Sequence, residues 1–289
     1  MPRLRTTPNG LIVAATFAAC AHPAPKEPSK EPSSFTQADS YEQLMGRWSR
    51  LLAPVFVEFA GVHDGAAVLD VGSGTGNLSV AIRKVDRSGK IEGIDLSPPF
   101  VEYATKHHAD ATIHFQVGDA QKLPFPDASF DAALSLLVLN FVPDPALALR
   151  EMRRVTKPGG TLAADVWDYG GDMEMLRIFN EEVLALDPTY VTDAQRMPLG
   201  QPGKLLELFR VAGLDQVEEK AIDTPLHFAS FDDYWQPFLL ATGPGGAYVA
   251  KLTPERRDTL AARLRKRLGD GPFDLKGRSW AVKGTVPPR

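Results

Sequence analysis

The sequence predicts an α/β fold, in which a doubly wound, mostly parallel sheet carries helices on both of its faces. Two observations lead to this prediction. Short apolar runs of the kind that buried parallel strands use recur along the chain, and a helical pattern of apolar residues follows most of them. The first such run, residues 67–71, enters a tight glycine turn and then a helix, as a βαβ unit does at its start.

The composition is that of a globular protein, and it excludes several classes of function. The chain has 289 residues, of which 44% are hydrophobic and 24% charged, enough to bury a full core. A net charge of −4 provides no basic field for nucleic acid or an anionic membrane. Cys20 is the single cysteine, so no disulfide within the chain is possible, and the six histidines show no metal-ligand spacing. We therefore expect no metal, no nucleic-acid partner and no stable membrane span.

Residues 1–40 are predicted to be an N-terminal extension and linker. Arg3 and Arg5 precede an apolar run at 11–19 that ends at Cys20, a pattern similar to a bacterial lipoprotein signal. This run is too short to cross a bilayer as a helix. A disordered extension or an early start codon explains the same pattern, and in that case we expect a cytoplasmic protein. The Pro, Lys, Glu and Ser content of 21–40 predicts a flexible linker.

The glycine turn is the main functional signal. Asp70 stands at the end of the first strand, and Gly72, Gly74 and Gly76 follow at alternate positions. Glycine permits positive φ and close approach of a ligand to the backbone, and the amides of the next helix point at that ligand. A dinucleotide fingerprint needs glycine where Asn77 stands, and an acid before the turn suits an ammonium group better than a pyrophosphate. A glycine turn without a ligand is the alternative.

Two further acids come at the ends of the next two predicted strands. Asp95 falls about 20 residues past the glycine turn, the spacing at which a carboxylate meets the hydroxyls of a ribose. The alternative role of Asp95 is to cap the next helix, although Ser97 already supplies a helix start. Asp119 is either a second ligand-binding acid or a turn residue.

The other elements follow in order along the chain. An amphipathic helix is expected within 41–62, with an apolar face made by Leu44, Trp48, Leu51, Leu52, Val55 and Phe56. Strands are predicted at 90–94, 112–117, 130–138, 161–166, 217–228 and 279–286, and helices from Pro98, from Pro145, at 172–186, at 203–212, from Ser230 and at 254–268. Two alternatives stay open: the aromatic cluster at 234–238 is core or a pocket wall, and the arginines of 254–268 are a solvated face or a nucleic-acid patch.

Taken in order, these segments resemble a known family. The motif D-x-G-x-G-x-G after a strand, IEGIDLS (91–97), VGDAQKLPFPDASFDAALS (117–135) and LREMRRVTKPGGTLAADV (149–166) look like the motifs of class I S-adenosylmethionine-dependent methyltransferases, in the type 11 subgroup that includes the ubiquinone and menaquinone biosynthesis methyltransferases. The resemblance implies a Rossmann-like, seven-stranded sheet whose last strand is antiparallel. It also implies a single domain at 41–289, with a cofactor-binding core at 41–168 and a C-terminal part at 169–289 that completes the sheet and the acceptor pocket.

The resemblance assigns roles to individual residues. Asp119 is expected to accept a hydrogen bond from the adenine amine, the amide of Ala120 to donate to the ring, and Leu136 to pack beside the adenosine. Arg47 either reaches the methionine carboxylate of the cofactor or is a solvated helix residue. The expected cofactor-binding set is Asp70, Gly72, Ser73, Gly74, Gly76, Asp95, Leu96, Asp119, Ala120, Leu136 and Arg47. No catalytic residue is identified.

The expected reaction is in-line transfer of a methyl group from S-adenosylmethionine to a small-molecule acceptor. A sulfonium methyl is already activated, so the protein mainly aligns the acceptor, methyl and sulfur in a dry pocket. A nicotinamide-dependent oxidoreductase is one alternative, against which Asn77 and Asp119 argue. A cofactor-binding protein without catalysis is another. The acceptor, its reacting atom and the oligomeric state stay open.

Overall fold

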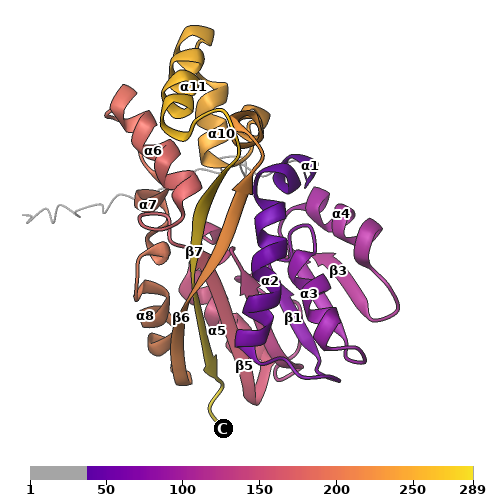
Figure 1. The fold of residues 1–289 in the computed structure, drawn as a ribbon. Helices are drawn as coiled ribbons and strands as arrows, with labels where there is room; N and C mark the ends of the chain where they lie inside the picture. The colour runs from indigo at the N-terminus through magenta and orange to yellow at the C-terminus, as the bar shows by residue number, and fades with distance from the viewer. Residues whose placement is uncertain (1–37, 289) are drawn as a thin grey trace, which may run out of the picture. The chain divides into compact units, whose positions relative to one another are not determined.

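Seven strands form one sheet in the order β3-β2-β1-β4-β5-β7-β6 (Figure 1). The strands are β1 (Val68–Val71), β2 (Ile91–Asp95), β3 (Ile113–Val117), β4 (Phe130–Leu136), β5 (Thr156–Trp167), β6 (Asp215–Phe228) and β7 (Phe273–Thr285). The pairs among β1 to β5 are parallel, and β7 runs antiparallel to both of its neighbours. The predicted fold class, a mostly parallel seven-stranded sheet with an antiparallel last strand, is therefore confirmed.

The computed structural model describes residues 38–288. All of them fall into one compact unit. The apolar run at 11–19, Cys20 and most of the predicted linker lie outside the described residues. Within 38–288 no helix is both long enough and apolar enough to cross a membrane. The same residues hold no grouping of three or more histidines, cysteines or acids that is suited to a metal ion.

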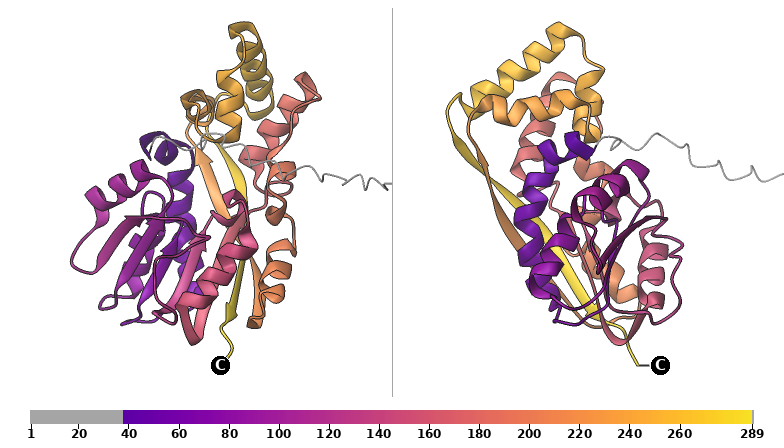
Figure 2. Two further views of the ribbon diagram at one scale, coloured as in Figure 1. Left: turned by 180° about the vertical axis from the view of Figure 1, so that it is seen from behind. Right: turned by 90° about the vertical axis from the view of Figure 1, so that its right-hand side faces the viewer.

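Helices cover both faces of the sheet (Figure 2). They are α1 (Ala38–Tyr41), α2 (Arg47–Ala60), α3 (Asn77–Val85), α4 (Pro98–His108), α5 (Pro145–Val155), α6 (Glu174–Leu186), α7 (Asp193–Arg196), α8 (Lys204–Val211), α9 (Phe231–Trp235), α10 (Gly243–Ala250) and α11 (Pro254–Leu268), with a π-helical segment η1 (Glu42–Gly46) between α1 and α2 and 3-10 segments η2 (Leu139–Phe141), η3 (Pro198–Gly200) and η4 (Gln236–Leu240). Two buried clusters fill the space between the sheet and these helices. One packs α2 and α3 against Val68 and Ile91, and the other packs α5 and α8 against Leu69 and Ile94.

The apolar face of α2 differs from the predicted one at two positions. Trp48, Leu52 and Phe56 are buried as expected, whereas Leu51 is 51% and Val55 39% exposed. The buried stripe instead continues through Ala53 and Val57. The apolar pattern on this helix is wider than the surface it buries, so periodicity alone did not locate the edge of the stripe.

The strands β6 and β7 continue well past the end of β5. β5 pairs with residues 279–285 of β7, whereas the β6–β7 ladder extends from 285 back to 273. The projecting half of this hairpin packs into the same buried cluster as α6, α9, α10 and α11. It rises beyond the carboxyl end of β5, as Figure 1 shows. A C-terminal cap is thus built above the edge of the sheet where the parallel strands end.

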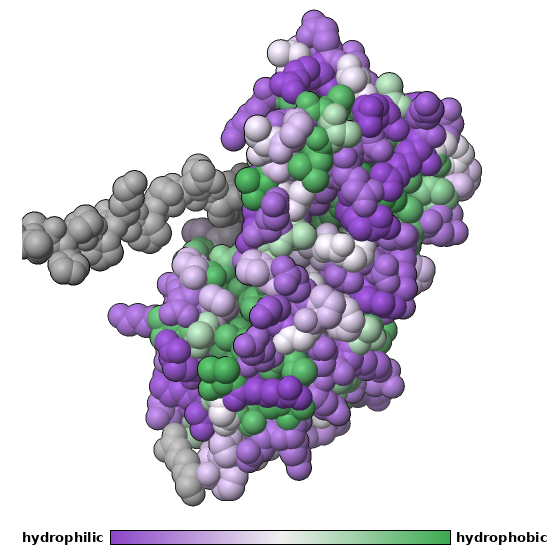
Figure 3. Space-filling model, turned by 90° about the vertical axis from the view of Figure 1, so that its left-hand side faces the viewer, coloured by the Kyte–Doolittle hydropathy of each residue, from purple (hydrophilic) through white to green (hydrophobic). Residues whose placement is uncertain are grey.

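Three of the five arginines of α11 are paired with acids of neighbouring elements. Arg263 bonds to Glu182, Arg267 to Glu181 and Glu182, and Arg265 to Asp232. Hydrophilic side chains prevail on the face of the molecule in Figure 3, with hydrophobic ones in smaller groups between them. Arg263, Arg265 and Arg267 thus belong to ion-pair networks between elements, which favours the solvated-face interpretation of this helix.

Candidate functional site

Three carboxylates predicted to share a ligand come from the carboxyl ends of three adjacent parallel strands. Asp70 lies in β1, and Asp95 is the last residue of β2. Asp119 comes after β3, with only Gly118 between the strand and this acid. The order β3-β2-β1 places these ends side by side. In the β1–β2 register Val71 lies opposite Ile94, so Asp70 and Asp95 come from neighbouring positions on two paired strands. Ligands bind at such strand ends in open α/β sheets.

The glycine turn after β1 is held against β2 by its backbone. The amides of Gly72 and Ser73 both donate to the carbonyl of Ile94, at 2.7 and 2.9 Å. Gly72, Gly74 and Gly76 all have positive φ, at 76°, 52° and 92°. A Cβ at Gly72 would lie 2.4 Å from the side chain of Val138, just after β4. Glycine is therefore required at this position both by conformation and by space.

Asp95 links the turn to the helix that follows β2. One carboxylate oxygen accepts from the amide of Gly74 at 2.9 Å and the other from the amide of Ser97 at 2.8 Å. Burial raises the pKa of Asp95, while these two amide bonds lower it. Each oxygen retains a lone pair for a further donor. Asp95 thus holds Ser97, the residue before α4, without bonding to an amide in the first turn of that helix, and its oxygens still offer acceptor sites.

Asp70 is fully buried, and its side chain turns toward α3. Ser79 donates to its Oδ2 at 2.7 Å, and its Oδ1 has no hydrogen-bond partner among residues 38–288. Burial, the largest cause, and the charge of Asp95 raise the pKa of Asp70 to about 7. The predicted direct contact with an ammonium group is untested, but the observed bond gives Asp70 a clear role in fixing α3 beneath the turn.

The remaining predicted cofactor residues surround Asp95 and Asp119. Leu96 is 69% exposed, while Leu136 at the end of β4 is buried. Asp119 accepts from the amide and side chain of Gln121, which orients its carboxylate, and Ala120 is half-buried.

Sequence reasoning missed a polar contact between η1 and the glycine turn. Glu42 accepts from the hydroxyl of Thr75 and from the amide of Asn77, the latter at 2.9 Å. Arg50 pairs with the same carboxylate. More than thirty residues separate Glu42 from the turn, so no spacing in the sequence marks this contact. Asn77, interpreted from the sequence only as a missing glycine, is one of the residues that fixes η1 on the turn.

Arg47 bonds to the C-terminal cap. Its guanidinium donates to Asp233 of α9 at 2.7 Å and stacks over the rings of Trp48 and Phe228, at 4.2 and 4.8 Å. Arg47 therefore ties α2 to the C-terminal cap. Its Nε has no partner among the described residues, and its contact with the cofactor stays a prediction.

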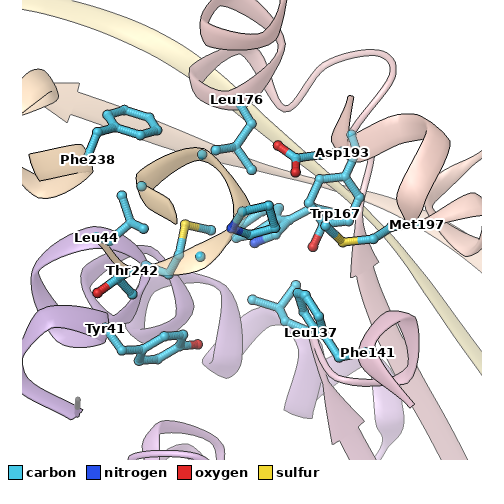
Figure 4. A pocket seen from close by; sticks show the side chains of 16 residues that line it. Tyr41, Leu44, Leu137, Phe141, Trp167, Leu176, Asp193, Met197, Phe238 and Thr242 are labelled. Carbon is cyan, nitrogen blue, oxygen red and sulfur yellow. The ribbon is translucent and has the colours of Figure 1, made fainter. Parts of the chain in front are cut away.

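An apolar pocket opens between the strand ends and the C-terminal cap (Figure 4). Its lining includes Tyr41, Leu44, Met45, Leu137, Phe141, Trp167, Tyr169, Leu176, Asp193, Met197, Phe238, Thr242 and Gly243 to Gly246. Burial is the main cause that raises the pKa of Tyr41, and the charges of Glu42 and Asp95 add to it. Tyr41 lines the pocket, and the next residue, Glu42, bonds to Thr75 and Asn77, so the pocket adjoins the glycine turn.

The surroundings of Phe238 and Tyr234 show whether the aromatic cluster at 234–238 is core or pocket wall. It stacks on Phe179 with ring centroids 4.4 Å apart, and it also lines the pocket. Tyr234 is fully buried and donates to the carbonyl of Met175 at 2.9 Å. The cluster is therefore core, with Phe238 at the point where the core becomes pocket wall.

Asp193 is the one charged residue of this lining. It is 2% exposed, and its Oδ2 accepts from the side-chain amide of Asn180 at 3.1 Å. Burial raises the pKa of Asp193, while the bond from Asn180 and the charge of Arg196 lower it. No motif marks Asp193 in the sequence, because it lies in the connection between α6 and α8.

Comparison with known proteins identifies the segment around the glycine turn. Residues 69–164 match the family model described as a methyltransferase domain. Malonyl-[acyl-carrier protein] O-methyltransferase of Serratia marcescens is 32% identical over 175 residues, which cover 61% of this chain and 60% of that protein. The chain spans about half the length of the curated relatives it matches, or less.

Two solved structures share the fold at low identity. A Bacillus halodurans protein superimposes with a TM-score of 0.55 at 18% identity, over 82% of this chain and 99% of that one. Phosphoethanolamine N-methyltransferase 2 of Haemonchus contortus, solved with phosphomonomethylethanolamine and S-adenosylhomocysteine, gives a TM-score of 0.53 at 18% identity, over 87% of this chain and 57% of that one. These likenesses establish the fold of the sheet and its helices.

Proposed function

Since residues 69–164 are a class I S-adenosylmethionine-dependent methyltransferase domain, we propose that the chain transfers a methyl group from S-adenosylmethionine to a small-molecule acceptor. The observation that carries the proposal is the junction of two sites at Tyr41. Tyr41 lines the apolar pocket, and the next residue, Glu42, bonds to Thr75 and Asn77 at the glycine turn. We place the reaction in the cytoplasm, where the cofactor is supplied.

The residues at the strand ends fit this cofactor. The first turn of α3 has no side-chain cap among the described residues, so its amides are available to a ligand. The hydroxyl of Ser73 is likewise without a partner in the described chain. In the proposal Asp95 binds the ribose hydroxyls, Asp119 and the Ala120 amide bind the adenine, and Leu96 and Leu136 pack beside it. The backbone of 72–76 faces the methionine part.

Methyl transfer requires the protein mainly to align the reacting groups and to exclude water from the pocket. S-Adenosylmethionine supplies a sulfonium methyl whose leaving group is a neutral thioether. The apolar walls of the pocket, such as Leu44 and Met45, exclude water, and the rigid strand ends hold the reacting partners in line. Positioning of this kind is worth effective molarities of about 10⁵ M or more. We assign no general base.

Calorimetric titration with S-adenosylmethionine, S-adenosylhomocysteine and NADH tests the proposal. We expect the first two ligands to bind and NADH not to bind; binding of NADH alone would replace the proposal with a dehydrogenase. Incubation with methyl-labelled cofactor and a metabolite extract then separates an enzyme from a binding protein. Label on an extracted metabolite is the expected result, and tight binding without any transfer would contradict catalysis.

A further inference from the structure

The wall of the apolar pocket contains one hydrogen-bond donor and one acceptor that the described residues leave unpaired. The donor is Nε1 of Trp167, at the end of β5, and the acceptor is Oδ1 of Asp193, in α7. Their residues are 1% and 2% exposed. Buried polar groups without partners are rare in folded proteins and costly, so each of these atoms calls for a partner that enters the pocket.

The orientation of both groups is fixed by the surrounding structure. The second oxygen of Asp193 is held by Asn180 at 3.1 Å, which leaves Oδ1 as the oxygen available to a ligand. Trp167 is the last residue of β5, and its backbone pairs with Ser279 of β7. Most of the other lining side chains are apolar. The pocket is therefore built for an apolar body with a single polar feature.

The pairing of an N–H with a carboxylate oxygen selects the chemistry of that feature. A hydroxyl donates its proton to the carboxylate and accepts from the indole N–H at the same time. An ammonium group has no lone pair for the indole, and an ether or ketone oxygen has no proton for the carboxylate. A hydroxyl group carries a donor and an acceptor on one atom, and so it matches the two unpaired atoms in kind.

The two ends of the pocket have different neighbours. In Figure 4, Tyr41 and Phe141 lie on one side of the pocket, and Asp193 and Leu176 on the opposite side. Tyr41 contacts the ring of Phe100, and the next residue, Glu42, bonds to Thr75 and Asn77 at the glycine turn, so the side of Tyr41 adjoins the proposed cofactor site. Asp193 marks the far end.

We propose that the acceptor is a small, largely apolar molecule with a hydroxyl group, and that Asp193 and Trp167 bind this hydroxyl at the end of the pocket away from the cofactor. This inference rests on the proposed function for the direction in which the acceptor points. Asp193 and Trp167 are then specificity-determining residues, and the methyl-accepting atom lies nearer to Tyr41.

Three probes of one shape test the inference: 2-naphthol, 2-methoxynaphthalene and naphthalene, measured by equilibrium dialysis against the full chain. We expect 2-naphthol to bind at least about tenfold more tightly than either of the others, because only its oxygen both donates and accepts. In Asp193→Leu the three affinities should converge to within about threefold. Trp167→Phe should weaken 2-naphthol by about tenfold and leave naphthalene unchanged. Asp258→Leu, at an exposed aspartate of α11, is the matched control and should change nothing.

Each result of these binding measurements either supports or overturns the inference. Equal affinities of the wild-type chain for the three probes, or no binding of 2-naphthol, would overturn the inference. If Asp193→Leu does not fold, as thermal unfolding would show, the Trp167→Phe comparison stands alone and still decides. Titration with S-adenosylhomocysteine separates the two proposals. If the chain binds 2-naphthol but not S-adenosylhomocysteine, the proposed function is contradicted and the hydroxyl site is supported. If it binds S-adenosylhomocysteine but not 2-naphthol, the proposed function is supported and the hydroxyl site is contradicted.

Discussion

Asp95→Asn is the substitution that most directly tests the proposed cofactor site. In the wild-type chain both carboxylate oxygens accept backbone amides, from Gly74 at 2.9 Å and from Ser97 at 2.8 Å. Asparagine must turn its NH₂ group toward one of these two amides, so one charge-assisted bond is lost and two donors face each other. A hydrogen bond to a charged group contributes about 1.5–3 kcal/mol, and we expect unfolding free energy to fall by about that amount.

The effect on ligand binding is separate from the effect on folding. If the carboxylate also accepts from the ribose hydroxyls, the substitution costs about 1–3 kcal/mol of binding free energy. That range corresponds to a rise of about 5- to 150-fold in the Kd for S-adenosylhomocysteine. Isothermal titration calorimetry measures the Kd, and urea unfolding of the same preparation measures stability.

Asp110→Asn is a matched control for Asp95→Asn. Asp110 is exposed and accepts the amides of Thr112 and Ile113, at 2.6 and 2.9 Å, where β3 begins. Its substitution breaks the same kind of bond at the opposite end of a strand, so stability should fall while the Kd for S-adenosylhomocysteine stays the same. Unchanged affinity in Asp95→Asn, or an equal loss in both variants, would refute the assignment of the ribose to Asp95.

Three further variants probe the turn and its surroundings. Burial raises the pKa of Asp70 from 3.8 to about 7, so between these pH values the folded state binds more protons than the unfolded chain, and stability falls as the pH rises. In urea unfolding between pH 4 and 7, Asp70→Asn should remove a decrease in unfolding free energy on the order of 4 kcal/mol. An unaltered pH dependence of stability would contradict this. Gly72→Ala should cost about 1–3 kcal/mol more than Gly159→Ala in thermal unfolding, because both have positive φ but only the first meets a valine side chain; equal losses would leave φ as the sole cause. Arg47→Met should lower stability by up to about 1 kcal/mol through its partly exposed pair with Asp233 and leave the affinity for S-adenosylhomocysteine unchanged, whereas a tenfold loss of affinity would restore Arg47 as a cofactor ligand.

The parts of the fold that the sequence predicted are those written in local patterns. The turn after β1 is specified by glycines within five residues, and the acids of β1 and β2 stand at the strand ends themselves. Local chemistry also located the start of α9, where Ser230 accepts from the amide of Asp233 as an N-cap. In each case the residues that signal the feature are the residues that form it.

The parts that escaped prediction depend on contacts between distant segments. β7 was expected only from 279, but its pairing with β6 extends it back to Phe273. The pocket joins segments as far apart as Tyr41 and Gly246, and its charged residue, Asp193, has no motif around it. Periodicity reports which face of an element is apolar, and it carries no information on which distant segment covers that face.

One N-terminal segment joins the two sites, which leads to a last prediction. Tyr41 lines the pocket and contacts the ring of Phe100, and the next residue, Glu42, bonds to Thr75 and Asn77 at the glycine turn. Glu42→Ala should therefore weaken S-adenosylhomocysteine and 2-naphthol together, although residue 42 does not line the pocket. Each ligand should also bind more tightly in the presence of the other, since such coupling is reciprocal. Gln43→Ala, at the exposed neighbouring position, is the control, and a variant at Glu42 that weakens only S-adenosylhomocysteine would show that the sites act independently.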